Sequence, residues 1–113
     1  MDRKTAEIIN DYFSFLVLKY PNLKKAYLFG SYAKNREKDG SDIDIALVFT
    51  DLKEENKFDL QVQLMLQASE YDLRIEPHPF SDKEFNSWHP LVVEIKNTGI
   101  EINSSYSKEV SSI

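Results

Sequence analysis

Hydrophobic and polar positions along the chain predict three elements before residue 50. Apolar side chains recur at three- and four-residue spacings over residues 4–19, which predicts an amphipathic helix that ends before Pro21. Residues 25–29 are short and apolar, as expected for a strand closed by Gly30. Residues 42–49 alternate at first and then become continuously apolar, which predicts a second strand buried at its far end.

The same kind of pattern continues to residue 102. Residues 57–70 carry apolar side chains at helical spacings, and residues 71–76 predict a third strand that stops at the prolines of segment 77–79. Residues 90–97 predict a last helix, and residues 100–102 predict a short edge strand. This order indicates an α/β (α+β) fold in which helices flank a small mixed sheet.

The polar segments complete this picture. Ser31 is a natural N-cap for a helix that begins directly after the first strand. Residues 35–40 are polar and end in Asp-Gly, which is a turn signal. Because neither a repeat nor a linker is visible, residues 1–102 are expected to form one domain. The Ser-rich residues 103–113 are expected to form a flexible tail.

Composition narrows the classes of function. The chain has 113 residues, of which 42% are hydrophobic, and a formal net charge of −5. General nucleic-acid binding is not expected, because such proteins usually carry a basic surface. No apolar run approaches the roughly 20 residues that span a bilayer. The absence of cysteine excludes disulfides and thiolate metal sites. These features favour a cytoplasmic protein without a membrane association.

Asp42 and Asp44 are the first candidates for chemistry. Side chains alternate between the faces of a strand, so these two carboxylates point the same way while Ile43 points into the core. Neighbouring carboxylates repel each other unless a cation lies between them, and Mg²⁺ prefers oxygen ligands. Taken alone, the pair is more typical of a solvated strand start or of two surface acids.

Gly30 and Ser31 are the second candidates. Glycine lets a backbone approach a phosphate closely, and a helix that opens after it directs free N–H groups towards that phosphate. The Ser31 hydroxyl can donate a further hydrogen bond. Alone, this joint is ordinary turn chemistry. Its combination with an acidic strand about ten residues later predicts one cleft for a phosphate and a divalent metal.

Two segments together resemble the signature of the polymerase-beta nucleotidyltransferase superfamily, and the short chain resembles its minimal members, the MNT or MntA-like proteins. These segments are Gly30-Ser31-Tyr32-Ala33-Lys34 and Ser41-Asp42-Ile43-Asp44-Ile45. The family pattern is Gly-Ser-x-Ala-Arg-Gly followed by Ser-Asp-x-Asp. Lys34 replaces the usual Arg and keeps the charge but not the bidentate fork. Asn35 replaces the usual Gly and tolerates a left-handed backbone.

The resemblance implies a set of site residues. Nucleotide binding would fall to Gly30, Ser31, Lys34 and Ser41. Two Mg²⁺ ions would be held, with ATP as the substrate, by Asp42, Asp44 and a third acid. We assign that third acid to Asp72, because the Asp-apolar-Arg pattern of residues 72–74 resembles the family's third-acid strand.

Two neighbours of Asp72 complete the expected site. Glu76 is the alternative third acid, since a two-residue period would place both acids on the same face of the third strand. Arg74 could contact phosphate or form an ion pair. His78 and His89 are isolated and flanked by prolines, which favours loop or packing roles, with His78 placed where it could line the cleft.

The resemblance also implies a reaction and a partner. The chain would transfer AMP from ATP to a hydroxyl acceptor, a tyrosine of a HEPN-type toxin, and so act as an antitoxin. The short chain leaves little room for an acceptor-binding domain, so a partner or a homo- or hetero-oligomer would complete the site. Two alternatives stay open: an antitoxin that acts by binding alone, and nucleotidyl transfer to a small molecule.

Overall fold

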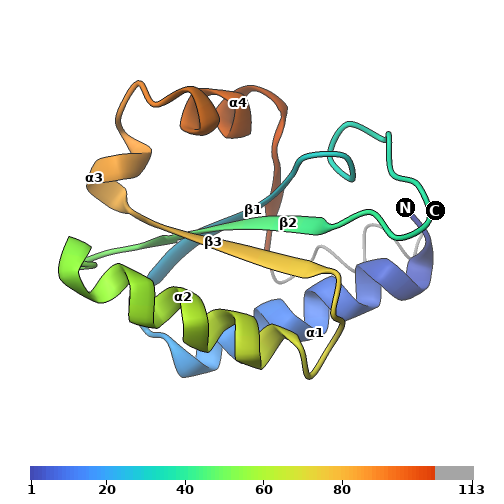
Figure 1. Ribbon diagram of the computed structural model, residues 1–113, viewed down its shortest axis with the longest axis horizontal. Helices are drawn as coiled ribbons and strands as arrows, with labels where there is room; N and C mark the ends of the chain where they lie inside the picture. Colours follow the sequence, from blue (N-terminus) through green and yellow to red (C-terminus); the bar gives the residue numbers. More distant parts are fainter. Residues whose placement is uncertain (104–113) are drawn as a thin grey trace.

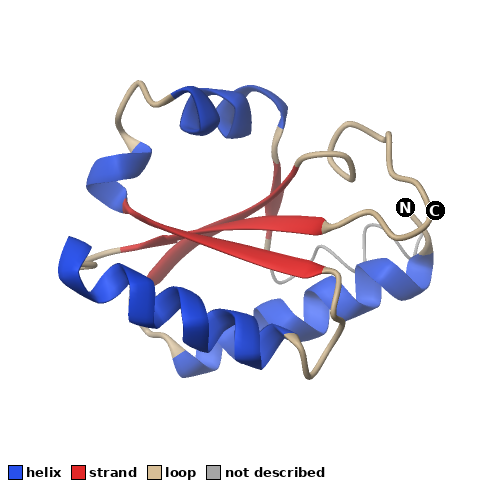
Figure 2. Cartoon of the chain, in the orientation of Figure 1, coloured by secondary structure: helices blue, strands red, loops and turns tan. Residues whose placement is uncertain are grey.

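The computed structural model describes residues 1–103 and shows four strands and four helices in alternating groups (Figures 1 and 2). The expected tail lies, apart from Asn103, outside the described residues. In chain order the elements are α1 (Arg3–Lys19), β1 (Leu23–Phe29), β2 (Ile43–Phe49), α2 (Glu54–Ala68), β3 (Ile75–Ser81), α3 (Asp82–Phe85), α4 (Pro90–Thr98) and β4 (Ile100–Ile102).

The strands form one mixed sheet in the order β3-β2-β1-β4. The β1 strand pairs antiparallel with β2 and with β4, whereas β2 and β3 run parallel. Helix α2 supplies the crossover that a parallel pair needs. The predicted α/β (α+β) class with a small mixed sheet is therefore confirmed, as is the short strand at residues 100–102.

Helices cover both faces of the sheet (Figure 1). Helices α1 and α2 lie together on one face, where they bury the odd-numbered side chains of β2, such as Ile45 and Leu47. Helices α3 and α4 lie on the other face over a smaller cluster that includes Val48 and Phe80. The even-numbered side chains of β2 and β3 therefore face α3 and α4. Within the described residues, none of the helices is long and apolar enough to cross a membrane.

The third strand differs from its prediction. It spans Ile75–Ser81 and runs through the two prolines, instead of stopping before them. Because β3 is an edge strand, the proline nitrogens need no partner when they face away from β2. The carbonyl of Pro77 faces that outer side and accepts a hydrogen bond of 2.6 Å from the Gln61 side chain of α2. The position of the strand in the sheet thus explains why the proline signal was misread.

The predicted helix at Ser31 is also wrong. Residues 30–35 form consecutive turns and no helix. Lys34 N–H donates to the Gly30 carbonyl at 3.2 Å, and Arg36 N–H donates to the Ser31 carbonyl at 2.8 Å. Asn35 has a φ of 57°, so its expected left-handed backbone is confirmed. The chain turns back before a second helical turn can form, and the segment reaches β2 as an irregular loop.

A buried hydrogen bond joins the two helices beneath the sheet. The Tyr12 hydroxyl of α1 donates to the Leu64 carbonyl of α2 at 3.0 Å, and burial raises the pKa of this phenol. Replacing Tyr12 by phenylalanine is expected to lower the free energy of unfolding by about 1 kcal/mol. Urea denaturation measures this loss. Tyr20→Phe, which removes a less buried bond to Gln67, is the matched control and should cost less. An equal or larger loss for Tyr20→Phe would contradict this account.

Candidate active site

Asp44, Glu76 and His78 form a cluster at the start of β2 and β3. Asp44 and Glu76 are register partners across the parallel pair, so their side chains lie next to each other on the α3/α4 face. His78 follows two residues later on the same face, and its Nε2 lies 3.1 Å from Asp44 Oδ1. One ligand atom from each of the three residues lies within 4.8 Å of the others. This donor set fits a divalent cation.

Asp42 lies immediately before β2 and is exposed. The expectation that Ile43 points into the core is confirmed, since this side chain is fully buried. Asp42 is not one of the three residues whose ligand atoms lie together.

Gly30 brings the end of β1 against Asp44. Its φ is +73°, and a Cβ built there would lie only 2.5 Å from Asp44 Oδ2. The absence of a side chain therefore does more than favour a turn, because it makes room for the carboxylate itself. Ser31 follows directly and is half-buried. The predicted phosphate loop and the strand that carries Asp44 thus meet at one point.

Asp72 lies in the turn before β3, where Arg74 occupies both of its carboxylate oxygens. Arg74 Nε donates to Oδ1 at 3.0 Å and Nη2 donates to Oδ2 at 2.9 Å, while the Arg74 backbone N–H also reaches Oδ1 at 2.8 Å. These bonds hold the pKa of Asp72 below its usual value. The prediction that Asp72 and Glu76 share a face of the third strand is wrong, because the strand begins only at Ile75.

Arg74 connects this turn to the loop after β1. Its Nη1 donates a hydrogen bond of 2.9 Å to the hydroxyl of Tyr32, whose ring is buried in the core. The hydrogen bonds and charge of Asp72 raise the pKa of the guanidinium, although its partial burial opposes this shift. Of the two roles considered for Arg74, the structure shows the ion pair, and this pair fixes the loop that carries Ser31.

The pairing of Asp72 gives a pH-dependent contribution to stability. Because the folded-state pKa of Asp72 lies below its ordinary value of 3.8, the stabilisation is complete above that value and is lost as the pH falls through the folded-state pKa. Asp72→Asn is expected to lower the free energy of unfolding by about 1–2 kcal/mol at pH 7. Urea denaturation from pH 7 to pH 2 measures the difference, which should shrink below pH 4. A difference that stays constant to pH 2 would contradict this origin.

Lys34 and Ser41 stand at the two ends of the same loop. The Lys34 ammonium forms an ion pair with Glu94 of α4. The Ser41 hydroxyl accepts a hydrogen bond of 2.8 Å from the Lys38 N–H. Both contacts hold the loop that connects β1 with β2. Lys34 is half-exposed within its pair, so its ammonium lies at the surface beside the predicted phosphate loop.

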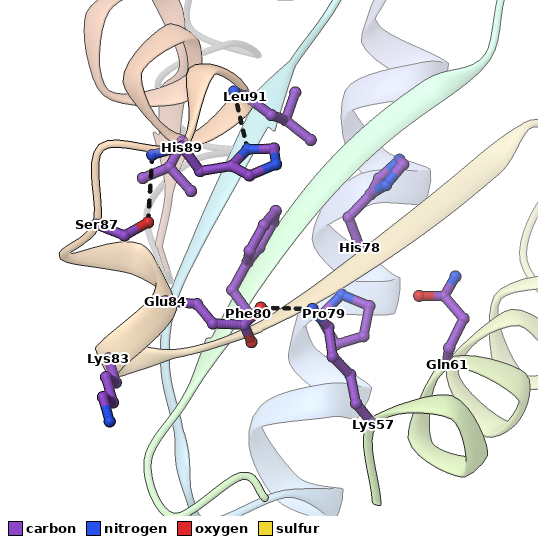
Figure 3. A pocket seen from close by; sticks show the side chains of 11 residues that line it. Lys57, Gln61, His78, Pro79, Phe80, Lys83, Glu84, Ser87, His89 and Leu91 are labelled. Carbon is purple, nitrogen blue, oxygen red and sulfur yellow. Dashed lines mark hydrogen bonds and ion pairs between the residues drawn. The ribbon is translucent and has the colours of Figure 1, made fainter. Parts of the chain in front are cut away.

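A cavity of about 590 Å³ adjoins the cluster on the β3 side (Figure 3). His78 belongs to both the cluster and the cavity wall. Further along, Phe80 and Leu91 provide apolar wall, and Lys57 lies 5.5 Å above the Phe80 ring while it forms a 2.7 Å ion pair with Glu84. The sequence favours a loop or packing role for His78 and also allows it to line the cleft; the cavity lining confirms the second of these. Its two-residue spacing from Glu76 is the signal that it shares this face.

The comparisons with known proteins define the family. Residues 9–106 match the family described as polymerase beta, nucleotidyltransferase. Because this match spans most of the chain, the protein belongs to that family and is a nucleotidyltransferase by class. The site at Gly30, Asp44 and Glu76 lies within the matched region. No curated protein sequence matches the chain.

Solved structures share the fold. One, from Sulfolobus solfataricus and provisionally assigned as a nucleotidyltransferase, is 24% identical with a TM-score of 0.59, covering 85% of this chain and 77% of its own. A toxin-antitoxin structure with AMP-PNP is 22% identical with a TM-score of 0.58, covering 91% and 81%. A complex of tri-AMPylated Shewanella oneidensis HEPN toxin with MNT antitoxin is 21% identical with a TM-score of 0.57, covering 98% and 87%.

Proposed function

We propose that this chain transfers AMP from ATP to a hydroxyl group on a partner protein, with a divalent metal held at Asp44 and Glu76. The observation that carries the proposal is the register pairing of these two carboxylates beside Gly30, on the open end of the α3/α4 face. Family membership supports nucleotidyl transfer as the reaction class. The cysteine-free composition supports a reducing, cytoplasmic setting.

Each residue of the site has a role in this reaction. A metal bound at Asp44, Glu76 and the nearby Asp42 would stabilise the charge that develops on the attacking and leaving oxygens. Gly30 admits the phosphates close to the backbone, and the Ser31 hydroxyl can donate to a phosphate oxygen. Lys34 supplies positive charge at the edge of the loop, where it can exchange Glu94 for a phosphate.

The arrangement of the strands assigns a side to each substrate. Gly30 follows β1, and β3 lies on the opposite side of β2. A phosphate tail at Gly30 and Ser31 therefore leaves the β3 side for the acceptor, because attack and departure are in line at the phosphorus. The cavity beyond His78 lies on that side. We accordingly propose that the cavity holds the acceptor. Glu76 is then the carboxylate nearest the acceptor hydroxyl.

A HEPN-type protein is the proposed partner, and one of its tyrosines is the proposed acceptor. Two of the three solved structures described above come from toxin-antitoxin complexes, one with an AMPylated HEPN toxin. The chain itself shows a surface suited to a protein partner, because large apolar side chains stand exposed along one stripe of α2. These side chains are Phe58, Val62, Met65 and Leu66.

A small-molecule acceptor is the second candidate, and the cavity favours it. A volume of about 590 Å³ lies within the range of about 300–1,000 Å³ that is usual for small-ligand pockets. Its apolar wall with a few charged groups is also typical of such pockets. The two candidates differ in the molecule that receives the AMP, which is either the partner protein or a small hydroxylated compound.

Labelled ATP provides the test. The protein is incubated with labelled ATP, Mg²⁺ or Mn²⁺, and the protein encoded beside it as the candidate HEPN-type partner. The proposal expects label on the partner, and none with the double variant Asp42→Asn, Asp44→Asn. Label that appears only on added small molecules would favour the second candidate. If the double variant protects cells from the toxin as well as the original chain does, antitoxin action rests on binding alone.

A further inference from the structure

His78 is the residue of the cluster that an oxygen-only metal site does not need. Its Nε2 lies 3.1 Å from Asp44 Oδ1, and its ligand atom lies within 4.8 Å of those of Asp44 and Glu76. The ring is held in place by an edge contact with Phe29, at a centroid distance of 5.0 Å. The His78 side chain remains 33% exposed, so its nitrogen can be reached from the adjoining cavity.

We propose that His78 supplies a nitrogen ligand to the metal at Asp44 and Glu76, so that this site selects a divalent transition ion such as Mn²⁺ over Mg²⁺. The inference rests on the proposed function, since it concerns the metal of the same site. Mg²⁺ demands oxygen ligands in octahedral geometry, whereas imidazole is a ligand of first-row transition ions. One imidazole and two carboxylates leave coordination positions open for phosphate oxygens and water.

The backbone places these three donors on one face of the sheet. Parallel register sets Asp44 beside Glu76, and the two-residue period of β3 brings His78 to the same face. The prolines on either side of His78 fix the φ angles of the strand around it. An orienting role alone, in which His78 only donates a hydrogen bond to Asp44, uses the same geometry. The two roles differ in whether the metal contacts nitrogen.

Pulsed electron paramagnetic resonance with Mn²⁺ separates these two roles. The full chain is loaded with Mn²⁺ in the absence of ATP, and the modulation from a directly bound ¹⁴N nucleus is recorded. We expect this modulation in the original chain and its loss in His78→Gln, whose amide can still donate a hydrogen bond to Asp44. Mn²⁺ affinity should fall in His78→Gln by more than the roughly 10- to 100-fold that loss of a merely orienting residue costs, while Mg²⁺ affinity changes less. His89→Gln, which removes the other imidazole of the cavity wall, should keep the signal.

Several outcomes would overturn the inference. These are bound Mn²⁺ without nitrogen modulation, no Mn²⁺ binding by the original chain, or an unchanged preference for Mn²⁺ over Mg²⁺ in a folded His78→Gln variant. The transfer assay distinguishes this failure from failure of the proposed function. AMP transfer without nitrogen modulation overturns the role of His78 alone. Nitrogen modulation without any transfer supports the role of His78 and counts against the proposed reaction.

Discussion

Replacing Glu76 by glutamine is expected to lower the rate of AMP transfer by about two to three orders of magnitude. Glu76 is the register partner of Asp44, and its carboxylate converges with that of Asp44 on one point. Loss of one such ligand removes several kcal/mol of transition-state charge stabilisation, and each 1.4 kcal/mol is about tenfold in rate. The measurement is the initial rate of labelled AMP transfer at saturating ATP.

Asp72→Asn is the matched comparison for Glu76→Gln. Each change removes one negative charge, at Glu76 in β3 or at Asp72 in the turn before it, but both oxygens of Asp72 are occupied by Arg74. We therefore expect Asp72→Asn to keep transfer within about tenfold, the lower end of the usual effects of residues behind a ligand shell. The opposite order of the two variants would return the third-acid role to Asp72 and contradict the assignment to Glu76.

Replacing Gly30 by alanine is expected to cost both stability and activity. A Cβ at this position would lie 2.5 Å from Asp44 Oδ2, and the φ of +73° strains any residue with a side chain. Strain of this kind costs about 1–3 kcal/mol. Displacement of the Asp44 carboxylate by about 1 Å would lower transfer by about 100-fold. Urea denaturation and the transfer assay measure the two effects separately.

Gly40→Ala is the control for this effect. Gly40 also has a positive φ, of +82°, but a Cβ there would meet nothing within 4 Å. It should therefore lose stability through backbone strain and keep its transfer rate. Equal losses of activity in the two variants would show that the contact between Gly30 and Asp44 is not what matters at this position.

The first half of the site was predictable from the sequence because its elements follow local rules. A strand that ends in Gly30, a polar loop, and an alternating strand with Asp44 and a buried Ile43 can each be inferred from a short window. Asn35 was predicted to tolerate a left-handed backbone, and its φ of 57° confirms this. The predicted sheet class followed from the order of these elements.

The second half depended on information that a local window does not contain. Whether prolines end a strand depends on which edge of the sheet they occupy, and that position is set by tertiary pairing. Once β3 is seen to begin at Ile75, the acid beside Asp44 becomes Glu76 and the histidine on its face becomes His78. The turn at Asp72 was misread because its Asp-apolar-Arg pattern serves an ion pair as well as a strand.

We propose above all that the Asp44–Glu76 face, beside Gly30, transfers AMP to a partner. Intact-mass spectrometry of the HEPN-type partner after incubation with ATP, metal and this chain tests it most directly. We expect added AMP on the partner with the original chain and none with Asp44→Asn, a variant that should remain folded. An unmodified partner under conditions where the original chain binds both ATP and metal would contradict the claim, as would equal modification by Asp44→Asn.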